Sequence, residues 1–503
     1  MSIISFLFVA FVGVVTVLYF GAPQRFRWLV LLAASTVFYA SFGGRALVLL
    51  ALSILADFAL ARLIGQTSQP GRRRLYLGLS LAINLGSLAL FKYFTPAVRG
   101  LDTSVAWLSF ARNLHILGTP IGLSFFTFAK LGYVIDVFRR QTSPEPSLGY
   151  FATFVAFFPN ITSGPIERAT HLLPQLKAGQ PFDAARAAEG LRRVLWGVCK
   201  KVVIADRLAI YVDAVYNQPR YYSGPALFLA TLFLAFQIYA DFSAYTDIAL
   251  GIAHLLGIDL FENFRQPYFA TSVFDFWRRW HISLTNWIRE YLLFPLSRGL
   301  LRKFRQRVAP QALQVVVYLA VMGLVGLWHG ASLTFVAWGL LHGLYLSVEL
   351  ALPARLRQPP HGRWETALRL GVTFGLVSLA WILFRANSLS DAGYIVSHML
   401  SLRGDFWSAI LYVIPVDPGV SALFTLLGLT AAPDQSLRLI GLVLSLALIG
   451  VLLLADLSDA RGGFLQSVSR APAWLRWSFY YAVTAGILFL GSWGQQAFLY
   501  FRF

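Results

Sequence analysis

Apolar windows of about 20 residues recur from one end of the chain to the other, and no other feature constrains the fold as strongly. A helix of this length crosses the hydrocarbon core of a bilayer, because each residue adds about 1.5 Å. Only 13% of the residues are charged, against about 25% in a soluble domain, so a soluble fold is excluded. We therefore predict an all-α polytopic membrane protein with about 11 transmembrane helices. The windows lie near residues 3–21, 28–43, 46–64, 75–93, 120–138, 224–240, 312–328, 331–350, 367–384, 436–456 and 477–495.

Shorter apolar pieces lie between these windows, near residues 148–158, 190–204, 242–257 and 405–427. They are too short to span a bilayer, so we predict short re-entrant and interfacial helices. No internal repeat and no sizeable soluble stretch remains, which predicts one membrane domain over residues 1–503. The first window lacks a basic region before it and an A-x-A site after it, so we expect a retained span rather than a signal peptide.

The net charge of +19 is carried by basic residues that fall between the apolar windows. Arg25 and Arg27 follow the first window, residues 72–74 the third, and Arg139 and Arg140 the fifth. Basic loops face the cytoplasm and contact anionic lipid, so this alternation places the N-terminus outside. The same distribution disfavours nucleic acid as a partner.

His329 stands at the end of one apolar window and just before the next. An ionisable side chain at membrane depth is costly and indicates a functional site, and histidine exchanges protons near neutral pH. Gly326 and Gly330 flank it and permit the close approach of another backbone. The alternative is a structural histidine bonded to a neighbouring carbonyl, which we favour only for His342. The two histidines are thirteen positions apart, so they lie on different helix faces and no metal pair is predicted.

Two further polar stretches interrupt apolar sequence. Residues 159–168 contain two prolines and a glycine, which forbid a continuous helix. This stretch is either a re-entrant segment at the wall of a tunnel or a surface loop with a helix beginning at Pro165. Asp241 and Asp247 lie in residues 237–247 and could pair with arginines, line a cavity or bind a cation. We favour ion pairing over catalysis, with Arg265 as one available partner.

A tryptophan-rich stretch between Trp277 and Tyr291 has the pattern of a short amphipathic helix, too charged to span a membrane. His281 falls at the edge of its apolar face. The stretch is either an interfacial helix at head-group depth or a helix folded into the protein that presents His281 to a cavity. The apolar face comprises Trp277, Trp280, Leu284, Trp287, Ile288 and Tyr291, and the polar face comprises Arg278, Arg279, Asn286, Arg289 and Glu290.

Several common kinds of chemistry are excluded. Cys199 is the single cysteine, so no internal disulfide and no cysteine-based metal site is available. We expect it to be a packing residue, with palmitoylation as the alternative. The chain contains no phosphate-binding P-loop, no H-E-x-x-H and no G-x-S-x-G motif. Acid–base chemistry by histidine remains.

Five motifs in order give the chain a resemblance to the membrane-bound O-acyltransferase (MBOAT) family, and most of all to its bacterial alginate O-acetyltransferase branch. The aromatic C-terminal end, residues 498–503, resembles the same branch. The motifs occupy residues 121–128, the S-G-P-I-x-R of 163–168, 237–247 with 262–268, the W-x-R-W-H-x-S-L region of 276–291, and the W-H-G-A of 328–331 with 338–343.

The resemblance implies many helices around a central funnel and tunnel, with core motifs over about 120–345 and further helices over about 365–503. It implies two active-site histidines, here His281 and His329, with His329 the principal one. It also implies an acyl donor at a cytoplasmic thioester, acetyl-CoA in the polysaccharide branch, with no bound cofactor. The implied partners are a periplasmic SGNH-type acetyltransferase and polysaccharide synthesis or export proteins, at a bacterial inner membrane. As candidate contacts to the donor we name Arg278, Arg279 and Asn286.

Departures from the family pattern leave alternatives open. Ala244 replaces a usual glycine, Glu290 replaces a usual aspartate, and residues 294–299 depart from I-P-L-G-G. The S-G-P-I-x-R form also occurs in the branch that transfers D-alanine to teichoic acid. Peptidoglycan O-acetylation and D-alanyl transfer are therefore alternatives. From other classes, a proton-coupled transporter using His329 and Asp241, and a non-catalytic export scaffold, remain as rivals.

Overall fold

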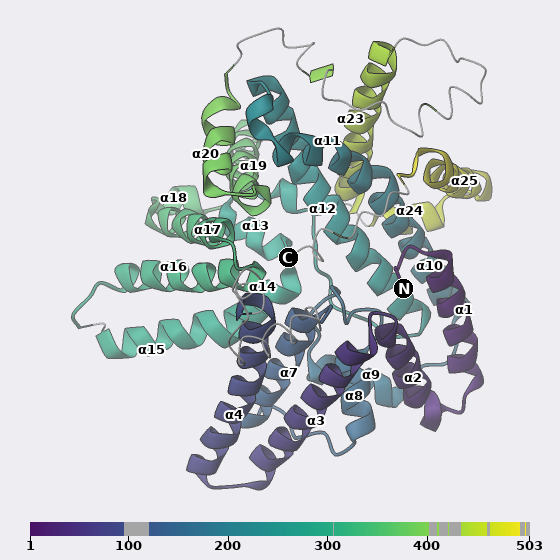
Figure 1. Ribbon diagram of the computed structural model, residues 1–503, viewed down its shortest axis with the longest axis vertical. Coiled ribbons are helices and arrows are strands. Elements are labelled where there is room, and N and C mark those ends of the chain that lie inside the picture. Colours follow the sequence, from purple (N-terminus) through teal and green to yellow (C-terminus); the bar gives the residue numbers. More distant parts are fainter. Residues whose placement is uncertain are drawn as a thin grey trace, which may run out of the picture. The chain divides into compact units, whose positions relative to one another are not determined.

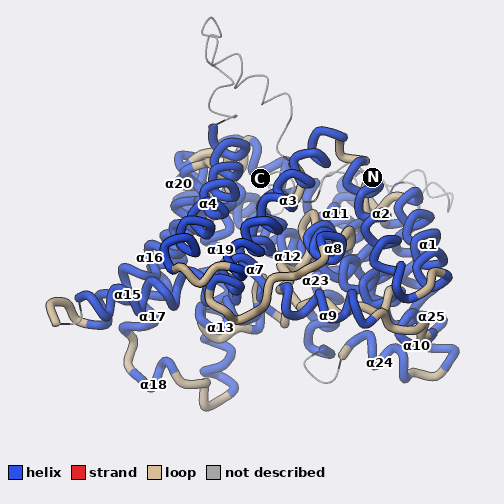
Figure 2. The backbone as a smooth tube through the Cα atoms, turned by 90° about the horizontal axis from the view of Figure 1, so that it is seen from below, coloured by secondary structure: helices blue, strands red, loops and turns tan. Residues whose placement is uncertain are grey.

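The computed structural model describes residues 1–94, 120–304, 306–401, 410–411, 421, 434–459, 463–492 and 498. Helices and connecting loops make up this described part, and none of it forms a strand (Figure 2). The chain divides into two compact units, residues 1–194 with 248–262, and residues 195–247 with 263–503. Most of the expected piece near 405–427 lies outside the described residues, as does the aromatic end after Phe498.

Seven helices of the described chain are long and apolar enough to cross a membrane. The protein is therefore a multi-pass membrane protein, although the number 11 is not confirmed. Four of the predicted windows are not among the seven helices. The windows near 3–21, 28–43 and 120–138 form shorter helices, the shortest of which has 14 residues and reaches only about 21 Å. The window near 477–495 is described only in part and falls in α25 (Ala473–Leu490). The seven are α3 (Gly44–Gln66), α4 with the π-helical η2 (Pro70–Ala89 and Leu90–Phe94), α12 (Gly224–Leu255), α16 (Pro310–His329), α17 (Leu333–Ala351), α19 (Arg363–Arg385) and α23 (Asp434–Asp459).

The first unit is held together by a buried polar cluster between α3, α4 and α7 (Leu123–Phe138). The Nζ atom of Lys130 lies 3.1 Å from Oδ2 of Asp57, while Ser80 and Asn84 donate hydrogen bonds to the same carboxylate. Because buried charges must be paired, this cluster fixes how the three helices meet. The unit also contains α1 (Phe6–Gly21), η1 (Gln24–Phe26), α2 (Arg27–Ala40), α8 (Leu148–Ala156), α9 (Ala169–Ala178) and most of α10 (Ala184–Cys199).

The proline-rich stretch 159–168 is non-helical and almost wholly buried. The side chain of Asn160 donates to the carbonyl of Pro165 at 3.1 Å, and buried Glu167 accepts from the backbone of Phe261 at 2.6 Å. The surface-loop alternative was therefore wrong, since the next helix begins at Ala169 rather than Pro165. Broken backbone buried within protein is the condition under which such a segment persists in a membrane protein.

The helix α12 continues through both acidic residues of the 237–247 stretch, so the window that we ended at residue 240 extends to Leu255. Asp241 accepts from Lys201 at 2.7 Å, and Asp247 pairs with Lys200 at 2.5 Å. The expectation of ion pairing is confirmed, but the partners are lysines of the π-helical η4 (Lys200–Ala205) and not Arg265. Paired carboxylates do not interrupt a helix, which explains its length.

Helices α16 and α17 run antiparallel and lie side by side along their lengths (Figure 1). A Cβ atom on Gly326 would lie 2.2 Å from the carbonyl oxygen of Phe335, and one on Gly339 would lie 2.1 Å from that of Met322. Gly326 therefore permits the backbones to approach closely beside His329, as the sequence predicted. A Cβ atom on Gly330 would instead meet the side-chain ring of Phe335 at 2.4 Å. The second unit further contains α11 (Asp206–Asn217), η5 (Pro219–Tyr221), η6 (Pro267–Phe269), α15 (Phe294–Phe304), α18 (Ala354–Arg357), α20 (Leu389–His398), α24 (Phe464–Arg470) and α25 (Ala473–Leu490).

Candidate active site

The tryptophan-rich stretch forms two helices rather than one. Helix α13 (Val273–Arg279) ends before Trp280, and α14 (Ile282–Ile288) begins after His281, followed by the π-helical η7 (Arg289–Leu293). The backbone of His281 is left-handed, with φ 43° and ψ 54°. Our single amphipathic helix was therefore wrong, because the chain turns sharply at this histidine.

A neighbouring segment holds this turn in place. The amide of Ile282 donates to the carbonyl of Asn263 at 3.0 Å, and the amide of Arg265 donates to the carbonyl of Arg279 at 3.0 Å. The left-handed conformation of a residue other than glycine costs about 1–3 kcal/mol and persists only where its surroundings impose it. Strained backbone of this kind is common at functional sites.

His329 is the last residue of α16 and is only 4% exposed. Aromatic rings enclose its imidazole, with ring centroids 4.7 Å away at Trp328, 5.1 Å at Trp338 and 5.2 Å at Phe384. The end of the helix and the turn into α17 thus place the ring inside protein.

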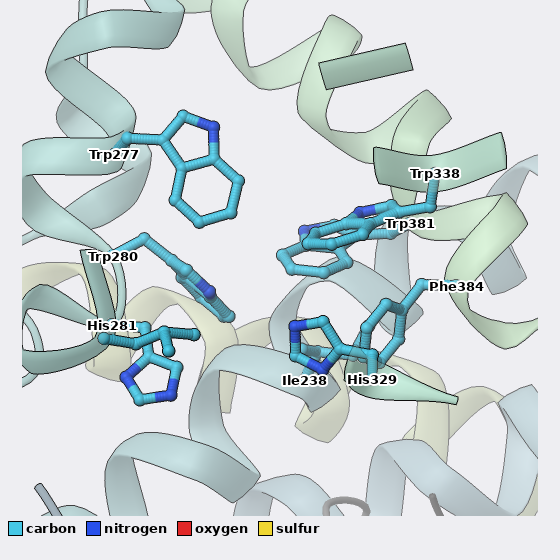
Figure 3. A pocket seen from close by; sticks show the side chains of 9 residues that line it. Ile238, Trp277, Trp280, His281, His329, Trp338, Trp381 and Phe384 are labelled. Carbon is cyan, nitrogen blue, oxygen red and sulfur yellow. The ribbon is translucent and has the colours of Figure 1, made fainter. Parts of the chain in front are cut away.

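His281 and His329 line the same cavity (Figure 3). His281 enters from the side that carries Trp277 and Trp280, and His329 from the side that carries Phe384 and two further tryptophans. The cavity has room for about one water molecule. The structure therefore brings together the two histidines that the sequence analysis selected. The other lining residues are Ile238, Leu284, Trp338 and Trp381.

His281 lies outside the membrane-spanning helices and is 1% exposed. Burial lowers the pKa of its imidazole to about 3, because the surroundings disfavour the charged form. At neutral pH the ring is uncharged, which is the form that accepts a proton. A small aromatic cavity with two imidazoles is suited to proton transfer with water largely excluded.

A second, larger cavity of about 270 Å³ adjoins the first and shares Trp277 and Leu284 with it. Its walls are mainly apolar, and Arg278 and Arg289 bring two guanidinium groups to it. Of the three residues named as donor contacts, only Arg278 lines this cavity. Arg279 instead pairs with Asp275 at 2.9 Å, and Asn286 lines neither cavity.

Sequence reasoning did not assign some of the residues around the cavities. Trp381 and Phe384 lie in the apolar helix α19, where no sequence signal distinguishes them from membrane-facing residues. Arg289 carried a signal, since it shares the polar face of the predicted amphipathic pattern with Arg278. Asn263 lay within a family motif and received no role of its own.

His342 is fully buried but does not line the cavity of His281 and His329. Its ring packs against Trp338 and Trp277, with centroids 5.0 Å and 5.2 Å away. Within the described chain its two nitrogens have no hydrogen-bond partner, so the expected carbonyl bond was wrong. Aromatic packing holds this ring instead.

The MBOAT, membrane-bound O-acyltransferase, family profile matches residues 136–383, which include both cavity histidines. The chain belongs to this family and is an acyltransferase. It is 36% identical over 403 residues to the probable alginate O-acetylase AlgI of Pseudomonas putida, covering 77% of this chain and 78% of that protein. The corresponding protein of Pseudomonas aeruginosa is 36% identical over 400 residues, covering 79% and 74%. The peptidoglycan O-acetyltransferase of Helicobacter pylori is 33% identical over 431 residues, covering 80% and 79%.

These similarities confirm the resemblance to the family and to its alginate branch. The single domain over residues 1–503 stays a prediction. The orientation of the N-terminus stays a prediction as well.

Proposed function

We propose that this protein transfers an acetyl group from a cytoplasmic thioester, acetyl-CoA, to a hydroxyl reached from the other side of the membrane, for O-acetylation of an exported polysaccharide such as alginate. The observation that carries the proposal is the pair of buried imidazoles, His281 and His329, in one small aromatic cavity. The similarity to alginate O-acetylases supports the acetyl group and the polymer.

In the proposed reaction His329 is the general base. The acceptor oxygen attacks the thioester carbonyl carbon while His329 takes the hydroxyl proton, a contribution of about 10²–10⁴ in rate. The new C–O bond replaces the C–S bond, and the leaving thiolate takes up the proton that His329 removed, which returns His329 to its neutral form. His281 assists from the opposite wall of the cavity. Aromatic walls that exclude water protect the thioester from hydrolysis.

The larger cavity suits the arm of a thioester donor. Its apolar walls match an alkyl-rich arm, and Arg278 and Arg289 supply positive charge for phosphates. Since it shares Trp277 and Leu284 with the histidine cavity, a thioester held there would reach the imidazoles. We assign donor binding to Arg278 and Arg289, and not to Arg279 or Asn286.

The proposed setting is the bacterial inner membrane, with the N-terminus outside. A periplasmic SGNH-type acetyltransferase would receive the acetyl group and complete its transfer, beside polysaccharide synthesis and export proteins. Peptidoglycan O-acetylation is the second candidate, and the similarity to the Helicobacter pylori enzyme is the observation that favours it. D-alanyl transfer to teichoic acid would be indicated by activity with a labelled D-alanyl thioester.

The test uses purified full-length protein in lipid nanodiscs, with labelled acetyl-CoA, labelled D-alanyl thioester, and alginate or peptidoglycan fragments as acceptors. His329→Ala and His281→Ala should abolish acetyl transfer to alginate, while His361→Ala, an exposed histidine, should leave it unchanged. Full activity of a folded His329→Ala protein would overturn the mechanism. Transfer to peptidoglycan or transfer of D-alanine would replace the polymer or the acyl group, and ion flux without transfer would favour a transporter.

A further inference from the structure

Asn263 is fully buried in the connection between α12 and α13, and contacts the turn at His281 with both its backbone and its side chain. Its carbonyl accepts from the amide of Ile282 at 3.0 Å. Its side-chain oxygen, Oδ1, accepts from the hydroxyl of Ser283 at 2.6 Å and from the amide of Ser283 at 3.3 Å. The same oxygen lies 3.4 Å from Nδ1 of His281. Its Nδ2 atom donates to the hydroxyl of Thr246 at 3.5 Å.

These contacts determine which way the amide of Asn263 faces. The backbone N–H of Ser283 can only donate, so the atom that it meets must be the amide oxygen and not the nitrogen. An amide oxygen can only accept. The nitrogen of His281 that lies against this oxygen must therefore carry a hydrogen, and it is Nδ1.

We propose that Asn263 is a positioning residue, which holds neutral His281 in the tautomer with hydrogen on Nδ1 and the lone pair on Nε2. The inference rests on the proposed function, in which His281 takes part in acyl transfer. It also bears on the role of His281, which could polarise the thioester carbonyl, orient the donor or relay a proton. Neutral imidazole in this tautomer has no hydrogen at Nε2, so this atom can accept a hydrogen bond from the acceptor hydroxyl and cannot polarise the thioester carbonyl.

The length of the Nδ1 contact fits this role. A distance of 3.4 Å is longer than a typical N–H···O bond, and hydrogen bonds of catalytic groups often shorten only when substrate is bound. The short hydrogen bond from the Ser283 hydroxyl, at 2.6 Å, holds Oδ1 of Asn263 in place. The hydrogen bond from Nδ1 of His281 can therefore shorten towards a fixed acceptor atom. A second residue that orients a histidine is the usual way in which proteins select its tautomer.

The chemical identity of Asn263 matters as much as its position. An amide accepts a hydrogen bond without adding charge, so burial keeps the pKa of His281 at about 3. A carboxylate at the same place would stabilise the imidazolium and raise that pKa. A protonated His281 cannot accept a proton. Asparagine therefore selects the tautomer and leaves the ring neutral.

The experiment compares Asn263→Leu, Asn263→Asp and His281→Ala with wild type, by kcat and its pH profile for acetyl transfer in nanodiscs. Asn263→Leu should lower kcat about 10–100-fold, the range found when the partner that orients a metal-bound histidine is lost. Asn263→Asp should be inactive at low pH and recover as pH rises, with its acid limb displaced upward from that of wild type. Asn387→Asp, which adds the same charge at an exposed asparagine, should leave the profile unchanged.

A second measurement does not depend on variants at Asn263. Solid-state NMR of protein labelled with ¹⁵N-histidine, with the His281 signals assigned by difference from His281→Ala, should show a protonated Nδ1 and a bare Nε2 at neutral pH. The opposite tautomer would overturn the inference, as would an unchanged pH profile and full kcat in folded Asn263→Asp. If folded His281→Ala keeps full activity, the proposed role of His281 fails instead, whatever the tautomer.

Discussion

The imidazole of His329 lies edge-on to the indole of Trp338, with ring centroids 5.1 Å apart and an angle of 89° between the planes. The two residues come from the paired helices α16 and α17. Trp338 is 1% exposed and also packs against Trp381 and Phe384. This tryptophan is therefore the central part of the wall that separates His329 from water.

Removing that wall should let water hydrolyse the thioester in competition with acetyl transfer. Trp338→Ala leaves a cavity beside His329, which should destabilise the protein by about 3–5 kcal/mol and admit water to the thioester. We expect more free acetate per acetyl group transferred, measured with labelled acetyl-CoA. Trp338→Phe retains an aromatic wall and should keep the ratio close to wild type. An unchanged ratio in folded Trp338→Ala would show that water is excluded by other groups.

The two arginines of the larger cavity should affect donor binding and not the chemical step. Arg278→Gln and Arg289→Gln each remove a positive charge that is proposed to meet donor phosphates. Each should raise KM for acetyl-CoA about tenfold, since a charge-assisted hydrogen bond contributes about 1.5–3 kcal/mol, and leave kcat nearly constant. An acetyl thioester that lacks phosphates should not distinguish the variants from wild type.

The control for this experiment is Arg363→Gln, an exposed arginine at the start of α19 that lines neither cavity. It should match wild type with both donors. If Arg278→Gln and Arg289→Gln behave as this control does, the donor phosphates bind elsewhere.

The sequence was sufficient for the helical class and for the choice of His281 and His329. Helix windows follow from hydropathy alone, and an ionisable residue between apolar windows is costly enough to single out His329. Their shared cavity required the structure. The break between α13 and α14 was not predictable, because the apolar repeat continues through Trp280 and His281 while the turn is imposed by Asn263, which is distant in sequence.

Contacts between residues that are distant in sequence also decide the length of α12 and the position of Trp381. The length of α12 depends on Lys200 and Lys201, whose pairing with Asp241 and Asp247 no local pattern reveals. Trp381 reaches the cavity through the packing of α19 on α17, and helix periodicity does not say which neighbour an apolar face meets. The local sequence pattern thus predicts the helices, whereas the contacts between helices decide which residues line the cavity.

The close contact of α16 and α17 should make Gly326 sensitive to the smallest enlargement. In Gly326→Ala the new methyl group would lie 2.2 Å from the carbonyl oxygen of Phe335, so the helices must separate beside His329. Overpacking of this kind costs about 1–3 kcal/mol, and we expect a lower Tm and a reduced kcat. Gly375→Ala has open space around it and should be neutral or stabilising. Equal Tm values for the two variants would contradict the observed packing.

The pair of Glu167 and His171 should make stability depend on pH. His171 donates from Nδ1 to the buried Glu167 at 2.7 Å, and this hydrogen bond raises the pKa of His171 above its usual 6.5. Burial raises the pKa of Glu167 as well. For a group whose pKa is raised by folding, the stabilisation is complete below the unfolded pKa and is lost as pH rises through the folded pKa. The part due to His171 should therefore be lost above about pH 6.5.

Thermal unfolding in nanodiscs between about pH 5.5 and 8.5 tests this directly, across the range where histidine titrates. Wild type should show a Tm that falls with rising pH, and the fall should be modest because His171 is partly exposed. His171→Gln keeps a side-chain donor near Glu167 but cannot titrate, so its Tm should vary less over the same range. His361→Ala, which removes an exposed histidine outside this pair, should retain the wild-type slope. Parallel curves for wild type and His171→Gln would assign the pH dependence to other groups.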